Sequence, residues 1–318
     1  MLIRRRLKDS RVSTVLLGKE VLTHPPSYNR KEKIRFLTIS IMPYLGFMSL
    51  PLSDIVVGLL LITILSYLAY RLKALTLSGA VASAVIGMIV LVGSGCWSWL
   101  FIIIIFFVTA SLFTRYKYAY KRSLGAAEAK GGARSWVNAV SNGGAAALFA
   151  AAEALFGGDI YAAAFLGVVA TAASDTLATE VGLLSKTKPR LIIDLRRQVE
   201  PGTSGGVTPL GTTMAVVGAL MIGFSAYLFG FLGGSLLKVI AVGAIGGMVG
   251  SIGDSVMGAL LQEKYRCAVC GRVVEQPIHH GVKGFFVSGI RRFDNNLVNL
   301  TSTFIGAFAA IAVFLLMS

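Results

Sequence analysis

Charge is scarce in this sequence: only 14% of its 318 residues are charged, whereas 55% are hydrophobic. A chain of this length with so little charge is too apolar for a soluble domain. Cysteine is scarce as well, and three cysteines provide no disulfide framework. The sequence also lacks a zinc finger, an RNA-binding aromatic signature and a Walker A loop, and no cleavable apolar leader follows its basic N-terminus. These absences argue against nucleic-acid binding and direct attention to the membrane.

Long apolar runs predict an all-α fold, a polytopic membrane helix bundle. Most of the runs reach the roughly 20 residues that span a bilayer. The first is short and contains Pro43, so it could instead be re-entrant or interfacial, or it could continue across Pro51 as a broken hairpin. We expect a basic tail, residues 1–35, and then a single membrane domain, residues 36–318. The nine expected segments are residues 36–50, 54–70, 75–94, 96–114, 139–157, 160–184, 207–232, 236–261 and 296–317.

The distribution of basic residues predicts the orientation of this bundle. With the N-terminus inside, the inner segments hold 29 of the 30 Lys and Arg residues, and Lys238 is the exception. The positive-inside rule therefore predicts an integral multi-pass protein of the cell membrane with its N-terminus inside and its C-terminus outside. The outer turns are short, so we expect the active site among the long loops of the cytoplasmic face, residues 115–138, 185–206 and 262–295.

Acidic residues at membrane depth are the first candidates for chemistry. Asp175 and Glu180 lie near the inner end of the segment 160–184, and an ionised carboxylate there costs about 2.5–3.5 kcal/mol unless it is paired or coordinated. Five residues apart, they point about 140° away from each other on an ideal helix. A metal or substrate role is one interpretation, and a structural ion pair is the other. Asp254, near the inner end of a glycine-rich segment, is either a ligand or a buried structural acid.

Asparagine amides at the start of two membrane segments also need partners. Asp294 opens the last segment, where it could bind metal or cap the helix. Oxygen donors of the Asp and Asn type suit Mg²⁺, which prefers hard ligands. In the other of these two segments, two asparagines lie one helical turn apart and could contact substrate or cap their helix. The asparagines are Asn295, Asn296 and Asn299 after Asp294, and Asn138 and Asn142 in the other segment.

A glycine-rich turn and two arginine pairs predict phosphate binding. The turn contains Gly202, Thr203, Gly205 and Gly206, and its backbone amides could hold phosphate oxygens ahead of a helix that begins near residue 207. Positive charge lies just before the turn and just before the last segment. The two pairs are Arg196–Arg197 and Arg291–Arg292.

A cysteine pair, Cys267-x-x-Cys270, is followed by His279 and His280. One CxxC with two adjacent histidines is an incomplete zinc signature, so the sequence permits zinc at Cys267 and Cys270 without favouring it. His280 could instead be a polar loop residue near a phosphate.

With these motifs, the chain resembles the domain-of-unknown-function-92 integral-membrane family over about residues 50–318. That family includes transmembrane protein 19 and the plant chloroplast phytyl-phosphate kinase. A more distant likeness is to membrane CTP-using enzymes, the polyprenol kinases and CDP-diacylglycerol synthases, although the second acid of their last motif is an asparagine here. The family motifs are Lys73–Ala80, Asn142–Gly144, Ser174–Gly182, Pro201–Val207, Gly253–Ser255 and Asp294–Asn299.

The resemblance implies a Mg²⁺-dependent prenyl-phosphate kinase. Such an enzyme would transfer the γ-phosphoryl group of a nucleoside triphosphate, CTP by this likeness, to an isoprenoid monophosphate of the phytyl or geranylgeranyl type. The three aspartates Asp175, Asp254 and Asp294 would be catalytic and hold Mg²⁺, with Glu180 and the asparagines after Asp294 in support. The glycine-rich turn and the arginines before it would bind nucleotide phosphates. The arginine pair before Asp294 would bind the lipid phosphate.

Two other function classes remain open. A cytidylyltransferase that makes a CDP-activated lipid would release pyrophosphate. An ion-coupled secondary transporter would carry acids near the midplane within inverted repeats. The acids here crowd towards one face and no repeat is obvious, which favours the kinase over the transporter. The sequence also leaves a scaffold role and homo-oligomerisation open.

Overall fold

Eight long helices form the membrane part of the molecule. The computed structural model describes residues 50–127, 129–233 and 235–318. Within these ranges, eight helices are long and apolar enough to cross a membrane. They confirm eight of the nine expected segments, and the first, residues 36–50, lies outside the described residues except for its last position. The helices are α2 (Leu52–Arg71), α3 (Leu77–Ser94), α4 (Trp97–Arg115), α7 (Trp136–Phe156), α8 (Asp159–Gly182), α9 (Pro209–Leu228), α10 (Leu236–Leu260) and α11 (Asn295–Leu316).

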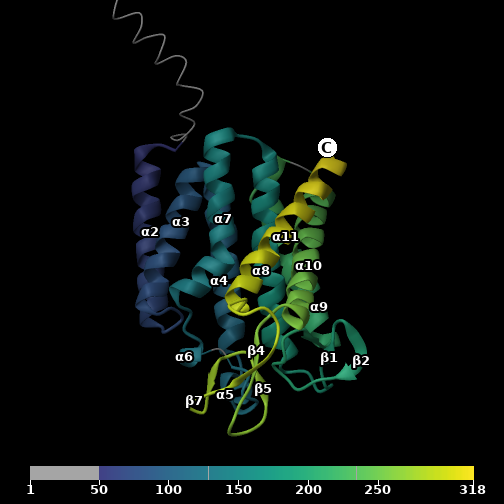
Figure 1. Cartoon of the computed structure of the whole chain (residues 1–318). Coiled ribbons are helices and arrows are strands. Elements are labelled where there is room, and N and C mark those ends of the chain that lie inside the picture. Colours follow the sequence, from purple (N-terminus) through teal and green to yellow (C-terminus); the bar gives the residue numbers. More distant parts are fainter. Residues whose placement is uncertain (1–49, 128, 234) are drawn as a thin grey trace, which may run out of the picture. The chain divides into compact units, whose positions relative to one another are not determined.

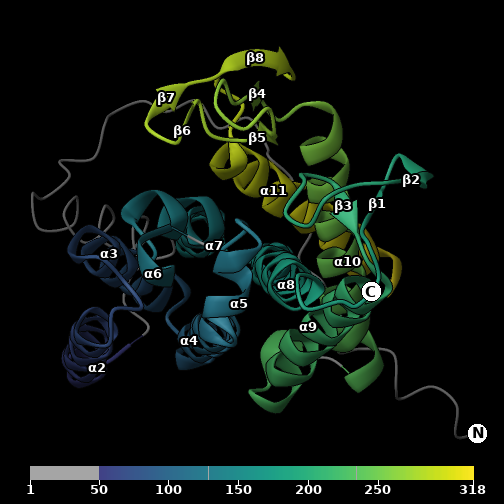
Figure 2. The same ribbon diagram turned by 90° about the horizontal axis from the view of Figure 1, so that it is seen from below.

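Helix α8 is the centre of this bundle. It packs against α4, α7, α9, α10 and α11, as the end-on view shows (Figure 2). Sixteen of its 24 residues are buried, and most of them are small. A Cβ atom at Gly167 would lie 2.5 Å from the carbonyl oxygen of Gly306, so the α8 and α11 backbones meet almost directly. Such contacts between small residues allow close helix packing in a membrane.

The long connections lie at one end of the bundle (Figure 1). They contain two short helices and eight short strands, which the sequence did not predict. Antiparallel sheets are formed in the orders β2-β1-β3 and β5-β4-β8, and β6 pairs with β7. The elements are α5 (Tyr118–Ser123), α6 (Ala129–Gly132), β1 (Arg190–Leu191), β2 (Asp194–Gln198), β3 (Gly206–Val207), β4 (Lys264–Arg266), β5 (Val273–Val274), β6 (Ile278–His279), β7 (Val282–Lys283) and β8 (Phe285–Ser288). The opposite end has tight turns and the 3-10 helix η3 (Phe231–Gly233).

Side-chain caps define where four helices begin at this loop end. Thr76 accepts a hydrogen bond from the amide of Gly79, and Thr208 accepts one from Gly211. Ser135 opens α7 with a capping box, and Asp294 opens α11. These caps satisfy amides that the first helical turn leaves unpaired. The N-termini of α7 and α11 are thereby fixed beside the C-terminal ends of α8 and α10.

Candidate functional site

Two carboxyl groups meet at the loop end of the bundle. Asp175 of α8 and Asp254 of α10 lie close enough to share a hydrogen bond when one of them is protonated. Both are half-buried, and each lies about two turns before its helix ends. Two carboxylates that meet away from water repel each other unless a proton or a cation lies between them. The structure therefore brings together two of the three predicted aspartates.

Helix α11 contributes polar groups to the same carboxylate pair. The hydroxyl of Ser302 donates to Oδ2 of Asp254 at 3.0 Å. In the amide orientation that satisfies its neighbours, the side-chain nitrogen of Asn299 donates to the same oxygen at 3.1 Å and to the carbonyl of Asn295 at 3.2 Å. Asn299 thus contacts Asp254, one of the aspartates with which the sequence had grouped it. Ser302 was missed, although it lies three residues after Asn299 and so shares a helix face with it.

Glu180 has a different partner from the aspartates. Its Oε2 atom lies 2.6 Å from the Nζ atom of Lys121 on α5, and the Lys121 side chain is fully buried. The same ammonium donates to the carbonyl oxygen of Phe113 at 2.6 Å. This contact is the structural ion pair that the sequence left open for Glu180. The Glu180 side chain points away from Asp175, in agreement with the offset of about 140° expected from their spacing. Lys121 was not among the predicted site residues.

The carboxylate of Asp294 accepts hydrogen bonds from its own helix, α11. Oδ1 accepts from the amide of Leu297 at 3.0 Å, and Oδ2 accepts from the side chain of Asn296 at 3.2 Å. Asp294 and Asn295 are exposed, whereas Asn299 is half-buried. In this structure Asp294 therefore caps α11, which is the second of the two roles that the sequence allowed. The contact with the carboxylate pair is made by Asn299, one turn further along the helix.

The glycine-rich turn packs against the C-terminal part of α10. A Cβ atom at Gly205 would lie 2.7 Å from the carbonyl oxygen of Ser255, and one at Gly202 would lie 2.6 Å from the Cβ of Ala126. Both glycines have positive φ angles, +84° and +78° for Gly202 and Gly205. The amides of Thr203 and Gly206 donate within the turn, to carbonyls at 3.1 and 2.9 Å. The turn therefore holds its shape by itself, and it lies next to the helix that carries Asp254.

The predicted arginine pairs occupy exposed strand and loop positions. Arg196 and Arg197 lie on β2, and all five residues of that strand are exposed. The guanidinium of Arg291 lies over the ring of Phe286, 5.1 Å from its centroid. The backbone amide of Arg292 donates to Oε2 of Glu263 at 2.8 Å, which leaves the exposed Arg292 side chain on the surface.

Glu275 connects two of the long loops, residues 185–206 and 262–295. Its carboxylate accepts a short hydrogen bond from the hydroxyl of Ser204, in the glycine-rich turn. Burial raises the pKa of Glu275 above its ordinary value, against the opposing effects of Ser204, Gln262 and Lys264. Nothing local in the sequence singles out this residue, because its partner lies 71 positions away.

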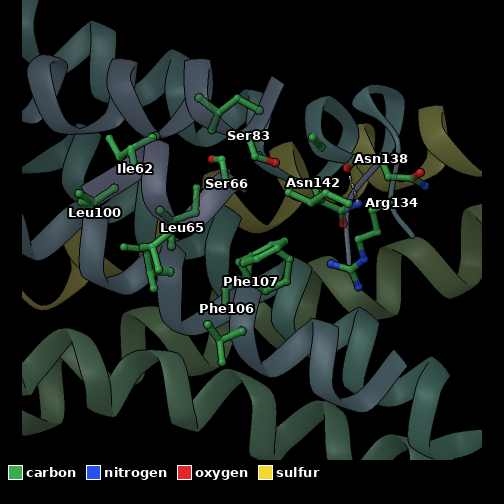
Figure 3. A pocket seen from close by; sticks show the side chains of 18 residues that line it. Ile62, Leu65, Ser66, Ser83, Leu100, Phe106, Phe107, Arg134, Asn138 and Asn142 are labelled. Atoms are coloured by element: carbon green, nitrogen blue, oxygen red, sulfur yellow. Dashed lines mark hydrogen bonds between the residues drawn. The ribbon is translucent and has the colours of Figure 1, made fainter. Parts of the chain in front are cut away.

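A partly open apolar pocket lies between α2, α3, α4 and α7 (Figure 3). Its volume is about 140 Å³, and most of its lining is aliphatic or aromatic. Ile62 and Leu100 lie at one end, and Arg134, Asn138 and Asn142 lie at the other (Figure 3). The pocket is therefore apolar along its length and polar at the end nearest the loops.

The polar end of the pocket adjoins the carboxylate pair through Arg134. Its guanidinium interacts electrostatically with Asp175 and donates to Oγ1 of Thr114 at 3.4 Å. Oδ1 of Asn138 accepts from the Ser135 amide at 3.0 Å, so Asn138 caps α7 while it also lines the pocket. The sequence placed Arg134 in a polar loop, and only the fold shows that it faces an apolar space.

The two cysteines and two histidines of the loop 262–295 also come together. One potential ligand atom from each of Cys267, Cys270, His279 and His280 lies within 4.8 Å of the others. The sequence did not favour this arrangement.

Comparisons with known proteins agree with this architecture. The profile of the integral membrane protein family DUF92 matches residues 60–307. The chain belongs to this family. Among DUF92-like relatives, an uncharacterized membrane protein of Methanocaldococcus jannaschii is 34% identical over 208 residues, 65% of this chain and 83% of that protein. Protein PGR of Arabidopsis thaliana is 29% identical over 280 residues, 81% of this chain and 95% of that protein. No solved structure matches significantly.

The resemblance predicted from the motifs is thus confirmed. DUF92 proteins are integral membrane proteins, and the eight described apolar helices agree with a multi-pass protein.

Proposed function

We propose that this protein is a membrane prenyl-phosphate kinase, which transfers the γ-phosphoryl group of a nucleotide to an isoprenoid monophosphate. The observation that carries this proposal is the apolar pocket whose polar end, at Arg134, adjoins the carboxylate pair of Asp175 and Asp254. A lipid phosphate has the same division between an apolar chain and an anionic end. The pocket would hold the isoprene units next to the phosphate, and the rest of the chain would extend into the bilayer.

Arg134 would bind the phosphate of the lipid. Guanidinium groups bind phosphate oxygens with paired hydrogen bonds, and a site at the edge of an apolar pocket strengthens this attraction. The side-chain amide of Asn142, which lines the same end, would add a polar contact. This assignment gives Arg134 the role that the sequence had predicted for Arg291 and Arg292.

The carboxylate pair fits Mg²⁺. Asp175 and Asp254 offer hard oxygen donors in a position where two negative charges need a cation, and Mg²⁺ is held in phosphoryl-transfer sites by one or two carboxylates. Bound there, the ion would neutralise charge on the transferring phosphoryl group. Ser302 and Asn299 would hold the Asp254 carboxylate in place. In this proposal Glu180 stabilises the fold, and Asp294 orients α11.

The nucleotide would approach from the loop side, which we propose is cytoplasmic. Arg196, Arg197 and the glycine-rich turn lie on that side, and the turn packs against α10 next to Asp254. A monophosphate acceptor is already a nucleophile, so the chain would need to position the two substrates rather than supply a strong base. CTP is the first donor to test, because of the likeness to CTP-using membrane enzymes.

The proposal is tested with purified full-length protein in nanodiscs. The assay supplies Mg²⁺, geranylgeranyl or phytyl monophosphate and γ-labelled CTP, ATP, GTP or UTP. We expect label in the lipid diphosphate, and a loss on the order of 10²–10³-fold in Asp175→Asn or Asp254→Asn. Asp159→Asn, an exposed acid at the other end of α8, is the matched control and should keep full activity. Label found only in pyrophosphate would replace the kinase with a cytidylyltransferase, and no turnover with any donor would overturn both.

A further inference from the structure

We propose that Cys267, Cys270, His279 and His280 form a structural zinc site that holds the loop 262–295 together. Their potential ligand atoms all lie within 4.8 Å of one another. Two thiolates and two imidazoles are a common ligand set for structural zinc. This inference is independent of the proposed kinase activity, because none of these residues takes part in it.

Two of the distances between the ligand atoms match tetrahedral zinc. Sγ of Cys270 lies 3.6 Å from Nδ1 of His279, and Sγ of Cys267 lies 3.7 Å from Nδ1 of His280. Bonds of about 2.3 Å to sulfur and about 2.0–2.1 Å to nitrogen, at tetrahedral angles, would separate the two atom types by about 3.6 Å. The side chains therefore need little movement to share one ion.

The backbone around the cysteines is shaped for metal binding. The amide of Val269 donates to Sγ of Cys267 at 3.4 Å, and such hydrogen bonds stabilise a metal-bound thiolate. Gly271 follows the CxxC with a φ of +70°, and its amide donates to the Cys267 carbonyl at 3.0 Å. The chain thus turns back immediately after Cys270.

A tight hairpin brings the adjacent histidines to the cysteines. His279 pairs with Val282, so His280 and Gly281 form a two-residue turn. Both have positive φ angles, +55° and +74°, as a type I′ turn requires. A histidine pays a conformational cost at such a position, and strain of this kind is found where function needs it. Here it allows both rings to face the CxxC.

The loop 262–295 has little hydrophobic core, so it needs a cross-link to hold its shape. Three of its strands are only two residues long. Val269, Val273 and Ile278 are 63%, 51% and 60% exposed. Small segments without a core are commonly held by a metal, whose binding energy becomes folding energy. The segment between the cysteines and histidines carries Glu275, so the ion would also hold its contact with Ser204.

The test measures metal in the full-length protein purified in detergent without chelators. We expect about one zinc per chain by mass spectrometry of the metal, and visible absorption of tetrahedral, thiolate-bound cobalt after exchange with Co²⁺. Cys270→Ser and His280→Ala should each lower the zinc content at least several-fold. Cys96→Ser is the matched control, because Cys96 precedes α4 at the opposite end of the bundle.

Three outcomes would overturn the zinc site. The first is a well-folded protein that holds no zinc and takes up no cobalt. The second is an unchanged metal content in Cys270→Ser, and the third is a Cys267–Cys270 disulfide in the freshly purified protein. If the cysteine variant does not fold, the cobalt spectrum of the wild-type protein decides the question.

Discussion

Lys121 and Glu180 form a buried ion pair between α5 and the C-terminal part of α8, with 2.6 Å between Nζ and Oε2. Removing one partner leaves an uncompensated buried charge, which costs about 3–5 kcal/mol. We therefore expect Lys121→Met or Glu180→Gln to lower the unfolding temperature in detergent markedly. Lys117→Met, a change at an exposed lysine of the same loop, should have almost no effect.

The double variant Lys121→Met/Glu180→Leu separates structure from chemistry at this pair. Replacing both charges with apolar groups should restore most of the stability. If Glu180 only supports the fold, this variant keeps the proposed kinase activity. A stable but inactive double variant would instead return Glu180 to the metal site that the sequence predicted.

For the apolar pocket we expect a selective effect on binding of the proposed lipid substrate. Ser66 faces the pocket from α2, and Ser66→Phe would fill space that the isoprene units need (Figure 3). We expect the KM for geranylgeranyl phosphate to rise about 10-fold or more, since a few carbon atoms in an apolar site are worth about 1–3 kcal/mol. The KM for the nucleotide should stay unchanged. Val57→Phe, on an exposed position of α2, is the control, and equal effects of the two changes would remove the pocket from the lipid site.

We expect the glycine-rich turn to require glycine at position 205. In Gly205→Ala, the new Cβ would lie 2.5 Å from that of Ala259, in addition to the strain of a φ of +78°. The turn must then move away from α10, and we expect nucleotide affinity to fall at least about 10-fold, since a good charged hydrogen bond is worth roughly 1.5–3 kcal/mol. Gly157→Ala has a similar φ of +65° with no atom within 4 Å, so it carries only the backbone cost. Nucleotide titrations that fail to separate these two variants would argue against the turn as a phosphate site.

Glu275 predicts a pH-dependent contribution to stability. Burial raises its pKa above the ordinary value of 4.5, so the folded state binds this proton more tightly than the unfolded state does. The stabilisation is complete below pH 4.5 and is lost as the pH rises through the raised pKa. Glu275→Gln, which keeps the acceptor for Ser204, should raise the unfolding temperature relative to wild type at pH 8, and the difference should vanish near pH 4. A lower unfolding temperature at pH 8 would contradict this prediction. Glu200→Gln, at an exposed acid, is the control.

Apolar length and local spacing made the helices and part of the site predictable. A run of about 20 apolar residues can satisfy its backbone in a membrane only as a helix, so the eight described segments followed from composition. The offset of about 140° between Asp175 and Glu180 depends only on helical geometry. It correctly indicated that the two acids contact different residues. Asp254 and Asn299 stood out because polar groups at membrane depth need partners.

Long-range pairings were not predictable in the same way. Glu180 and Lys121 lie 59 positions apart, and nothing local selects one lysine from the six basic residues of its loop. Arg134 has an ordinary loop sequence, and its position at an apolar pocket depends on how four helices pack. The strands of two or three residues are too short for a periodic pattern. His279 and His280 reach the cysteines only because of a hairpin turn that spacing alone does not specify.

The burial of α8 has a consequence for how the chain is made. Three of its neighbours, α9, α10 and α11, are synthesised after it, so a nascent chain that ends at residue 182 must hold this helix without three of its five neighbouring helices. Lys121 is already present to neutralise Glu180 at that stage, whereas the partner of Asp175 on α10 does not yet exist. The ion pair can therefore form while α8 inserts, whereas the carboxylate pair can form only after α10 has been made.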